Sequence, residues 1–265
     1  MPNPRSARDA VIADPQGTLL ALDFDGTLAH IVDDPTEAFA HDHSVAALSR
    51  LGKKLGHLAI ITGRPVRQAL ELGGFEGVIG LERLVIFGQY GQERWDAATG
   101  KFVVPPRDDS IADVEALLPG WLSDHDAEDV RVEDKGLAIA LHTRGLDPGV
   151  FDRILPALEE LAAAHGLDVE PGRQVVELRI AVVDKGDVLK AYVAEIGARQ
   201  VVFAGDDLGD IPAFEAVAEL RSQGIPGLLL CSASAEQDAL VALADIVLDG
   251  PDAVAVWLDE LADEL

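Results

Sequence analysis

The chain alternates short apolar runs with segments in which apolar residues recur at helical spacing. The apolar runs cover about Leu19–Phe24, His57–Thr62, Leu84–Phe87, Val201–Ala204, Leu228–Cys231 and Ile246–Leu248. Short apolar runs bounded by turn residues are typical of buried parallel strands. Helices are expected over Ser44–Leu55 with Ser44 as its cap, after Gly63-Arg64-Pro65, over Lys185–Ile196 and over Asp252–Glu264. These terminal parts predict an α/β fold, a doubly wound core around a parallel sheet.

The middle of the chain follows a different pattern, which begins after Pro105-Pro106. The expected elements are a helix over Ile111–Leu118, strands over Val130–Asp134 and Leu137–Thr143, a helix over Phe151–His165, a strand over Gln174–Ile180 and another short strand near Asp168. Alternating strands of this kind predict an inserted α+β domain with an antiparallel sheet. The core would then comprise residues 1–106 and 182–265, and residues 107–181 would form a cap domain for substrate recognition.

Two carboxylates follow the first apolar run directly, in the stretch Leu22-Asp23-Phe24-Asp25-Gly26-Thr27. Open α/β sheets bind ligands at the carboxyl ends of their strands. Two charges at such a place need compensation, for which a hard cation such as Mg²⁺ is suited. One carboxylate could attack a phosphorus atom while the other moves a proton. Taken alone, the Asp-x-Asp-Gly pattern also fits a calcium loop or a plain turn.

Three downstream positions strengthen the case for phosphate chemistry. Thr62 ends the second strand, where its hydroxyl could bond a phosphate oxygen. Lys185 begins a core helix, and both its ammonium and the helix N-terminus favour an anion. Asp206 and Asp210 lie four residues apart after the strand at Val201–Ala204. Each feature is ordinary by itself, so their order along the chain carries the argument.

This order resembles the four motifs of the haloacid dehalogenase superfamily of phosphotransferases. The resemblance implies that Asp23 is the nucleophile and that Asp25 is the acid–base, with Thr62 and Lys185 completing the catalytic set. It also implies a Mg²⁺ site formed by the Asp23 carboxylate, the Asp25 carbonyl and Asp206, with Asp210 acting through water or hydrogen bonds.

Further stretches resemble trehalose-6-phosphate phosphatases. They are Thr62-Gly63-Arg64, Gly88-Gln89-Tyr90-Gly91-Gln92-Glu93, Val132–Lys135, Ala140–Arg144 and Val175–Arg179. The resemblance implies magnesium-dependent hydrolysis of trehalose 6-phosphate through an aspartyl-phosphate. The residues that it assigns to substrate binding are Gly63, Arg64, Glu133, Lys135, Arg144 and Glu177. Structural ion pairs are the alternative role for Arg64 and Arg179.

Some positions depart from that family's pattern. Ile180 replaces a usual proline, Ala181-Val182-Val183 lacks a usual glycine, Thr143 stands between His142 and Arg144 in place of tyrosine, and Gly209 replaces a common threonine. Another disaccharide or pseudo-disaccharide phosphate therefore remains an alternative substrate. A phospho-accepting signalling module and a catalytically silent partner of a synthase are further alternatives. The acid pair, the insert and the complete set of core residues argue against both.

Charge restricts the partners. A formal net charge of −26 and a pI near 4.4 provide no basic field for nucleic acid or an anionic membrane. The expected partner is a small-molecule sugar phosphate, and functional pairing with a sugar-phosphate synthase is left open. Cys231, the one cysteine, excludes an intramolecular disulfide and is expected to be buried. The N-terminus does not resemble a signal peptide and no apolar stretch has transmembrane length, so a cytoplasmic location is expected.

Overall fold

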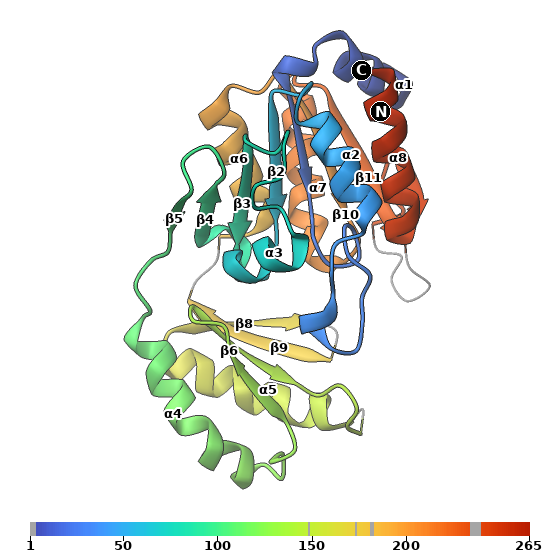
Figure 1. Ribbon diagram of the computed structural model, residues 1–265. Coiled ribbons are helices and arrows are strands. Elements are labelled where there is room, and N and C mark those ends of the chain that lie inside the picture. Colours follow the sequence, from blue (N-terminus) through green and yellow to red (C-terminus); the bar gives the residue numbers. More distant parts are fainter. Residues whose placement is uncertain (1–3, 148, 173, 181–182, 234–239) are drawn as a thin grey trace. The chain divides into compact units, whose positions relative to one another are not determined.

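The computed structural model describes residues 4–147, 149–172, 174–180, 183–233 and 240–265. The chain divides into two compact units, Met1–Val104 with Val183–Leu265, and Pro105–Val182. The insert predicted from the sequence covers residues 107–181, and Ala181 and Val182 lie outside the described residues. The two units are shown in Figure 1.

A sheet of eight strands, counted over the described residues, forms the centre of the first unit. Its strands are β1 (Thr18–Leu22), β2 (His57–Ile61), β3 (Leu84–Gly88), β4 (Glu93–Asp96), β5 (Lys101–Val103), β10 (Gln200–Gly205), β11 (Gly227–Ala233) and β12 (Ile246–Asp249). Their order is β12-β11-β10-β1-β2-β3-β4-β5, and all pairs are parallel except β3–β4 and β4–β5. The antiparallel edge is not predicted by the sequence, because β4 and β5 are short and rich in charge.

Helices cover both faces of this sheet (Figure 1). They are α1 (Pro4–Ala13), α2 (Asp42–Leu51), α3 (Val66–Gly73), α6 (Lys185–Ile196), α7 (Ile211–Ser222) and α8 (Gly250–Glu264). Leu20 and Leu22 of β1 join the apolar cluster with α2 and α8, whereas Leu19 and Ala21 join the cluster with α6 and α7. Because successive strand residues face opposite sides, a run buried on both faces marks a central strand. The predicted doubly wound α/β core is confirmed.

Some predicted element ends are wrong. Ser44 does not cap α2: it lies inside the helix, its hydroxyl is buried without a hydrogen-bond partner, and His41 takes the N-cap position. The helix also ends at Leu51 rather than Leu55. Helix α7 is not predicted, because it begins directly after the acidic turn at Asp210. By contrast, α6 has the predicted bounds, with Asp184 as its N-cap.

The second unit contains a four-stranded antiparallel sheet of order β6-β7-β9-β8. Its elements are α4 (Asp109–Asp124), β6 (Arg131–Asp134), β7 (Ala138–His142), α5 (Gly149–Ala164), β8 (Leu167–Gly172) and β9 (Val175–Ile180). Ile139, Leu141, Val176 and Leu178 pack on one face with apolar residues of α4 and α5. The alternate residues of these strands therefore form the other face. The predicted α+β insert with an antiparallel sheet is confirmed.

None of the helices in the described part of the chain is both long and apolar enough to cross a membrane. Cys231 is buried in β11, as predicted. Burial raises the pKa of its thiol to about 11, so the thiol is protonated near neutral pH and unreactive.

Candidate active site

Polar residues follow three neighbouring strands at one edge of the core sheet. Asp23 follows β1, Thr62 follows β2 and Asp206 follows β10. The parallel register aligns Leu22 of β1 with both Ile60 of β2 and Ala204 of β10, so these strand ends lie side by side. The pairing continues for one residue beyond β1, since the Asp23 amide donates to the Ala204 carbonyl at 2.9 Å. The site is thus built on rigid elements.

A buried acid cluster, defined as Asp23, Asp206 and Asp210, lies at this edge. One carboxylate oxygen from each residue lies within 4.8 Å of the others, so the cluster could hold a metal ion. Lys185 Nζ donates to Asp23 Oδ1 at 2.6 Å and to Asp210 Oδ1 at 2.7 Å. One ammonium facing three carboxylates leaves two negative charges uncompensated among these side chains if all of them are ionised.

The acid cluster is electrostatically unfavourable without a further cation. Burial raises the pKa of Asp23 well above its usual range, opposed by Lys185 and reinforced by Asp210. Burial and the Asp23 charge raise the pKa of Asp206 to about 10. Although burial opposes it, the Asp210 and Asp23 carboxylates raise the pKa of Lys185 well above its usual range, so the ammonium stays charged. The cluster therefore binds either protons or a cation.

Asp210 fixes the turn that presents Asp206. Its Oδ2 accepts hydrogen bonds from the backbone amides of Asp206 at 2.9 Å and Asp207 at 3.3 Å. The Asp207 carboxylate in turn accepts from the Gly209 amide at 2.9 Å, which completes a capping box. Asp210 is fully buried, and its oxygens are used by Lys185 and these amides. Within the acid cluster, Asp210 therefore holds Lys185 and the turn that carries Asp206.

The lack of a side chain at Gly26 leaves room for the Asp206 carboxylate of the acid cluster. Its φ is +72°, and a Cβ there would overlap the Asp206 carboxylate. The Gly26 carbonyl accepts a hydrogen bond from Ser232 Oγ of β11 at 2.5 Å, which ties the turn to the sheet. Ser232 was not predicted, because only the strand order brings it to this turn and no sequence signal marks it.

Asp25 is not a member of the acid cluster and is held by Arg64. Arg64 Nε donates to Asp25 Oδ2 at 2.7 Å and Nη2 donates to Oδ1 at 2.6 Å, a bidentate pair. Arg64 Nη1 also donates to the Pro35 carbonyl at 2.8 Å. Of the two roles considered for Arg64, the structure shows the ion pair. Substrate binding by Arg64 stays a prediction.

Thr62 and Gly63 lie beside this pair. The Arg64 amide donates to Thr62 Oγ1 at 3.1 Å, so the hydroxyl acts as an acceptor there and keeps its own proton to donate elsewhere. A Cβ at Gly63 would come within 2.8 Å of the Tyr90 hydroxyl oxygen, so a larger residue there would require the Tyr90 side chain to move. The loop is therefore packed closely at the edge of the sheet.

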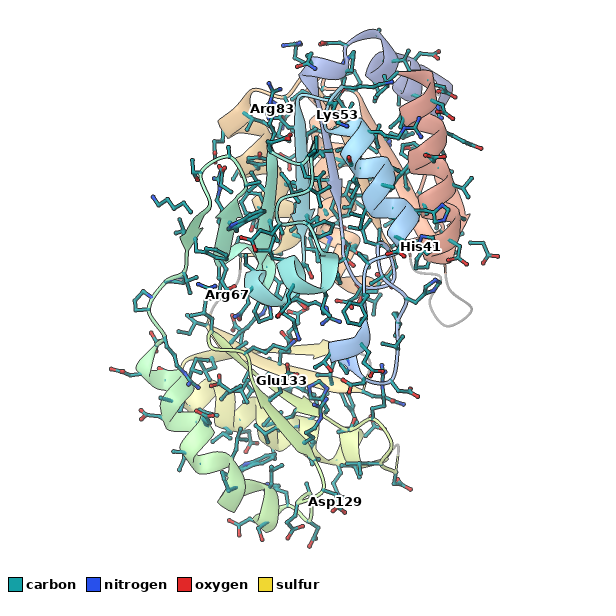
Figure 2. The ribbon with its side chains drawn as sticks, in the orientation of Figure 1. His41, Lys53, Arg67, Arg83, Asp129 and Glu133 are labelled. Atoms are coloured by element: carbon teal, nitrogen blue, oxygen red, sulfur yellow. The ribbon has the colours of Figure 1, made fainter. Side chains whose placement is uncertain are left out.

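In the second unit, charged residues share the sheet face opposite the helices. Register places Glu133 beside Ala140 and Ala140 beside Glu177, so both carboxylates project from this face. Lys135 Nζ bonds Glu177 Oε1, and the His142 Nε2 atom lies 2.7 Å from Glu133 Oε2. Bonding to His142 lowers the pKa of Glu133 despite its partial burial. Glu133 is labelled in Figure 2.

The structure brings together three of the four predicted substrate residues of the insert, namely Glu133, Lys135 and Glu177. Arg144 lies instead in an exposed turn after β7. Arg179 donates to Glu170 at 2.8 Å on the same face, which matches the ion-pair alternative. No role was predicted for His142, since its bond to Glu133 depends on strand pairing.

Comparisons with known proteins agree with this architecture. The family model described as trehalose-phosphatase matches residues 21–245. A trehalose-phosphate phosphatase of Mycobacterium avium is 30% identical over 255 residues, which is 92% of this chain and 62% of that protein. The chain thus spans less than two thirds of the length of this relative.

Solved structures show the same fold. The C-terminal domain of C. albicans trehalose-6-phosphate phosphatase has a TM-score of 0.79 at 21% identity, covering 98% of this chain and 97% of that one. A haloacid dehalogenase-like hydrolase from Bacteroides thetaiotaomicron has a TM-score of 0.64 at 15% identity, covering 92% and 99%. The haloacid dehalogenase-like fold implied by the motifs is confirmed. With the family match across most of its length, the chain belongs to the trehalose-phosphatase family.

Proposed function

We propose that this protein is a magnesium-dependent phosphatase that hydrolyses trehalose 6-phosphate to trehalose and phosphate. The observation that carries the proposal is the buried acid cluster with Lys185, at the carboxyl ends of β1 and β10, in a chain of this family. The excess negative charge of the acid cluster repels a phosphate dianion, so the reaction needs a cation at this place.

The residues present suit Mg²⁺. The available donors are carboxylate oxygens, which Mg²⁺ prefers, and the two uncompensated charges equal the charge of one such ion. The Asp23 and Asp206 carboxylates and the Asp25 carbonyl would hold it. When bound, Mg²⁺ would neutralise charge on the phosphoryl group and orient it.

The chain's own residues then supply the chemistry. Asp23 attacks phosphorus, an O–P bond forms, and the bond from phosphorus to the sugar oxygen breaks. Asp25 gives its proton to that departing oxygen, and later takes a proton from the water that hydrolyses the aspartyl-phosphate. Lys185 offsets charge beside Asp23, and Thr62 donates its hydroxyl proton to a phosphoryl oxygen. Arg64 keeps the Asp25 carboxyl group in place through the bidentate pair.

Residues of the insert recognise the sugar in this proposal. Glu133, Glu177 and Lys135 form a row of acceptors and donors on one sheet face, the kind of surface that binds sugar hydroxyls. Arg144 is assigned to the same task by its place in the motif alone. The reaction type depends on the core residues, whereas the identity of the sugar depends on these ones.

The test is phosphate release from a panel of trehalose 6-phosphate, sucrose 6-phosphate and glucose 6-phosphate, with Mg²⁺ and with a chelator. We expect the highest kcat/KM for trehalose 6-phosphate. After metal removal we expect no phosphate release from any of the three substrates. Preference for another disaccharide phosphate would keep the mechanism and replace the substrate. Full activity in chelator would contradict the mechanism itself.

A further inference from the structure

Glu93 is a buried carboxylate close to the active-site loops that has no role in the mechanism above. It lies at the start of β4 and is 8% exposed. Its Oε2 accepts a hydrogen bond from the Val66 amide at 2.6 Å, and its Oε1 accepts from Gln89 Nε2 at 3.1 Å. Burying a carboxylate is costly unless its oxygens are bonded, so these two contacts account for its charge being tolerated here.

The two partners of Glu93 belong to two loops: Val66 to the loop that contains Arg64, and Gln89 to the loop after β3. Val66 begins α3 directly after Arg64-Pro65. Its amide is one of the first-turn donors that have no partner within the helix itself, and Glu93 supplies that partner. Gln89 belongs to the turn after β3, where Gln89 and Tyr90 have φ values of +46° and +56°. Left-handed backbone is unfavourable for residues other than glycine and persists when the surroundings enforce it. Glu93 therefore connects the two loops through one hydrogen bond to each.

Backbone hydrogen bonds also join the same two loops. The Gln89 amide donates to the Arg64 carbonyl at 2.9 Å, and the Tyr90 amide donates to the Thr62 carbonyl at 3.0 Å. A Cβ at Gly88 would come within 2.6 Å of the Val66 nitrogen, which shows how closely the loops pack. Through the Val66 amide and through Gln89, Glu93 is therefore linked to the backbone of Arg64 from both sides.

We infer that Glu93 is a positioning residue, which holds Arg64 so that its guanidinium keeps Asp25 aligned for proton transfer. The inference rests on the proposed function, in which Asp25 protonates the departing sugar oxygen. Glu93 itself contacts neither the acid cluster nor Asp25 in the hydrogen bonds of the described residues. Its effect is transmitted through Val66, Gln89 and Arg64.

This role predicts a dependence on the leaving group. A poor leaving group such as a sugar alkoxide needs a proton from Asp25, whereas 2,4-dinitrophenolate departs without one. For E93A we expect kcat on the sugar phosphate to fall by about 10- to 100-fold, within the range of general acid catalysis. On 2,4-dinitrophenyl phosphate we expect a fall of less than about threefold. E93Q keeps an acceptor for the Val66 amide and should lie between E93A and the wild type.

Two controls separate positioning from loss of structure. E82A removes another glutamate of the same unit, one that accepts from the Gly80 backbone amide at 2.9 Å and 3.0 Å, and should leave both activities unchanged. The double variant R64A/E93A should be no worse than R64A alone, because Glu93 acts through Arg64. Equal losses of E93A on both esters, multiplicative losses in the double variant, or no loss at all would each overturn the inference.

A readout without turnover distinguishes this inference from the proposed function. The Arg64 Nε–H resonance in a ¹H–¹⁵N spectrum, assigned with R64K, reports the pair with Asp25. We expect it to shift or broaden in E93A and to stay unchanged in E82A. An unchanged Arg64 signal in E93A would overturn the inference even if the protein is an active phosphatase. An inactive wild type would overturn the proposed function and leave this measurement to decide the role of Glu93.

Discussion

Lys185 Nζ lies 2.6 Å from Asp23 Oδ1, although 162 residues separate the two in the sequence. The insert lies between them in the chain. Helix α6 begins at Lys185 and places this residue next to the end of β1. The lysine is the one cation that the described structure places in hydrogen bonds with the acid cluster. This contact joins the two halves of the core and underlies the first two predictions.

D23N should abolish turnover while leaving the fold intact. The amide has nearly the same shape as the carboxylate but does not attack phosphorus. We expect less than about a hundredth of the wild-type rate in the presence of Mg²⁺. A circular dichroism spectrum and melting curve like those of the wild type would show that folding is preserved. A folded variant with higher activity would mean that Asp23 is not the nucleophile.

K185M should destabilise the protein, because it leaves buried carboxylates without their ammonium partner. Breaking a buried ion pair by removing one partner typically costs about 3–5 kcal/mol. Urea unfolding at pH 7.5 in chelator measures the loss. At pH 5 the loss should shrink, because the folded variant compensates by binding protons and the free-energy cost of binding them falls as pH falls. A variant as stable as the wild type at both pH values would show that the contacts of Lys185 contribute little.

The metal-free protein should lose stability as pH rises. The pKa of Asp206 is raised in the folded protein to about 10, so the folded chain binds a proton that the unfolded chain has already lost above pH 4. The stabilisation is therefore full below the unfolded pKa and is lost progressively as pH rises toward 10, by at most about 1.4 kcal/mol per pH unit for one proton.

Mg²⁺ should counter this loss, because the cation and the proton compete for the same carboxylates. Melting curves from pH 5 to 9 would show a stabilisation by Mg²⁺ that grows with pH. In D206N, both the pH dependence and the effect of Mg²⁺ should shrink. A Mg²⁺ effect that is independent of pH, or that persists unchanged in D206N, would contradict the assignment of this acid cluster.

The sequence predicts the parts of the fold that depend on apolar patterning. β1 is buried along its whole length, and its continuous apolar run was sufficient to identify it as a central strand. Helix α6 has the predicted bounds, and in the structure Asp184 caps its start and Gly197 ends it in a left-handed conformation. Helix α7 and strand β4 escaped prediction, since an acidic turn and a charged edge give no periodic signal.

The site could be predicted only where a residue's role follows from its place at a strand end. Asp23, Thr62 and Asp206 meet because parallel strands align their carboxyl ends. The bidentate pair of Arg64 with Asp25 was not predictable, since it depends on the conformations of two loops. Side-chain contacts between loops become visible only in the three-dimensional structure.

G26A should impair the site through crowding alone. The added methyl group would overlap the Asp206 carboxylate and also forces alanine into a backbone with a φ of +72°. Displacing a catalytic group by about 1 Å costs roughly a hundredfold in rate. Mg²⁺ dependence and kcat should both change. G100A is the matched control, because Gly100 has a φ of +64° with nothing within 4 Å of its would-be Cβ. Equal effects of the two variants would attribute the loss to backbone strain.

The last prediction concerns the charged face of the second unit. If Lys135 and Glu177 bind sugar hydroxyls, their work is alignment of the substrate, separate from phosphoryl chemistry. E177A or K135A should then lower kcat/KM for the disaccharide phosphate by roughly 10- to 1,000-fold, or about 1.4–4 kcal/mol. The same variants should hydrolyse p-nitrophenyl phosphate almost as the wild type does, because that ester has no sugar hydroxyls.

The controls for this prediction come from the same unit. Because Lys135 and Glu177 bond each other, each single variant removes a partner of the remaining charge, and K135A/E177A tests whether that removal causes the loss. E115A removes a carboxylate of α4 that pairs with Arg107, so it should affect neither substrate. Equal losses on both esters would assign the pair to the fold of the insert, and no loss on either would place the sugar elsewhere. If the pair matters and trehalose 6-phosphate is nevertheless a poor substrate, Ile180 and the residues after it are the first place to seek an altered specificity.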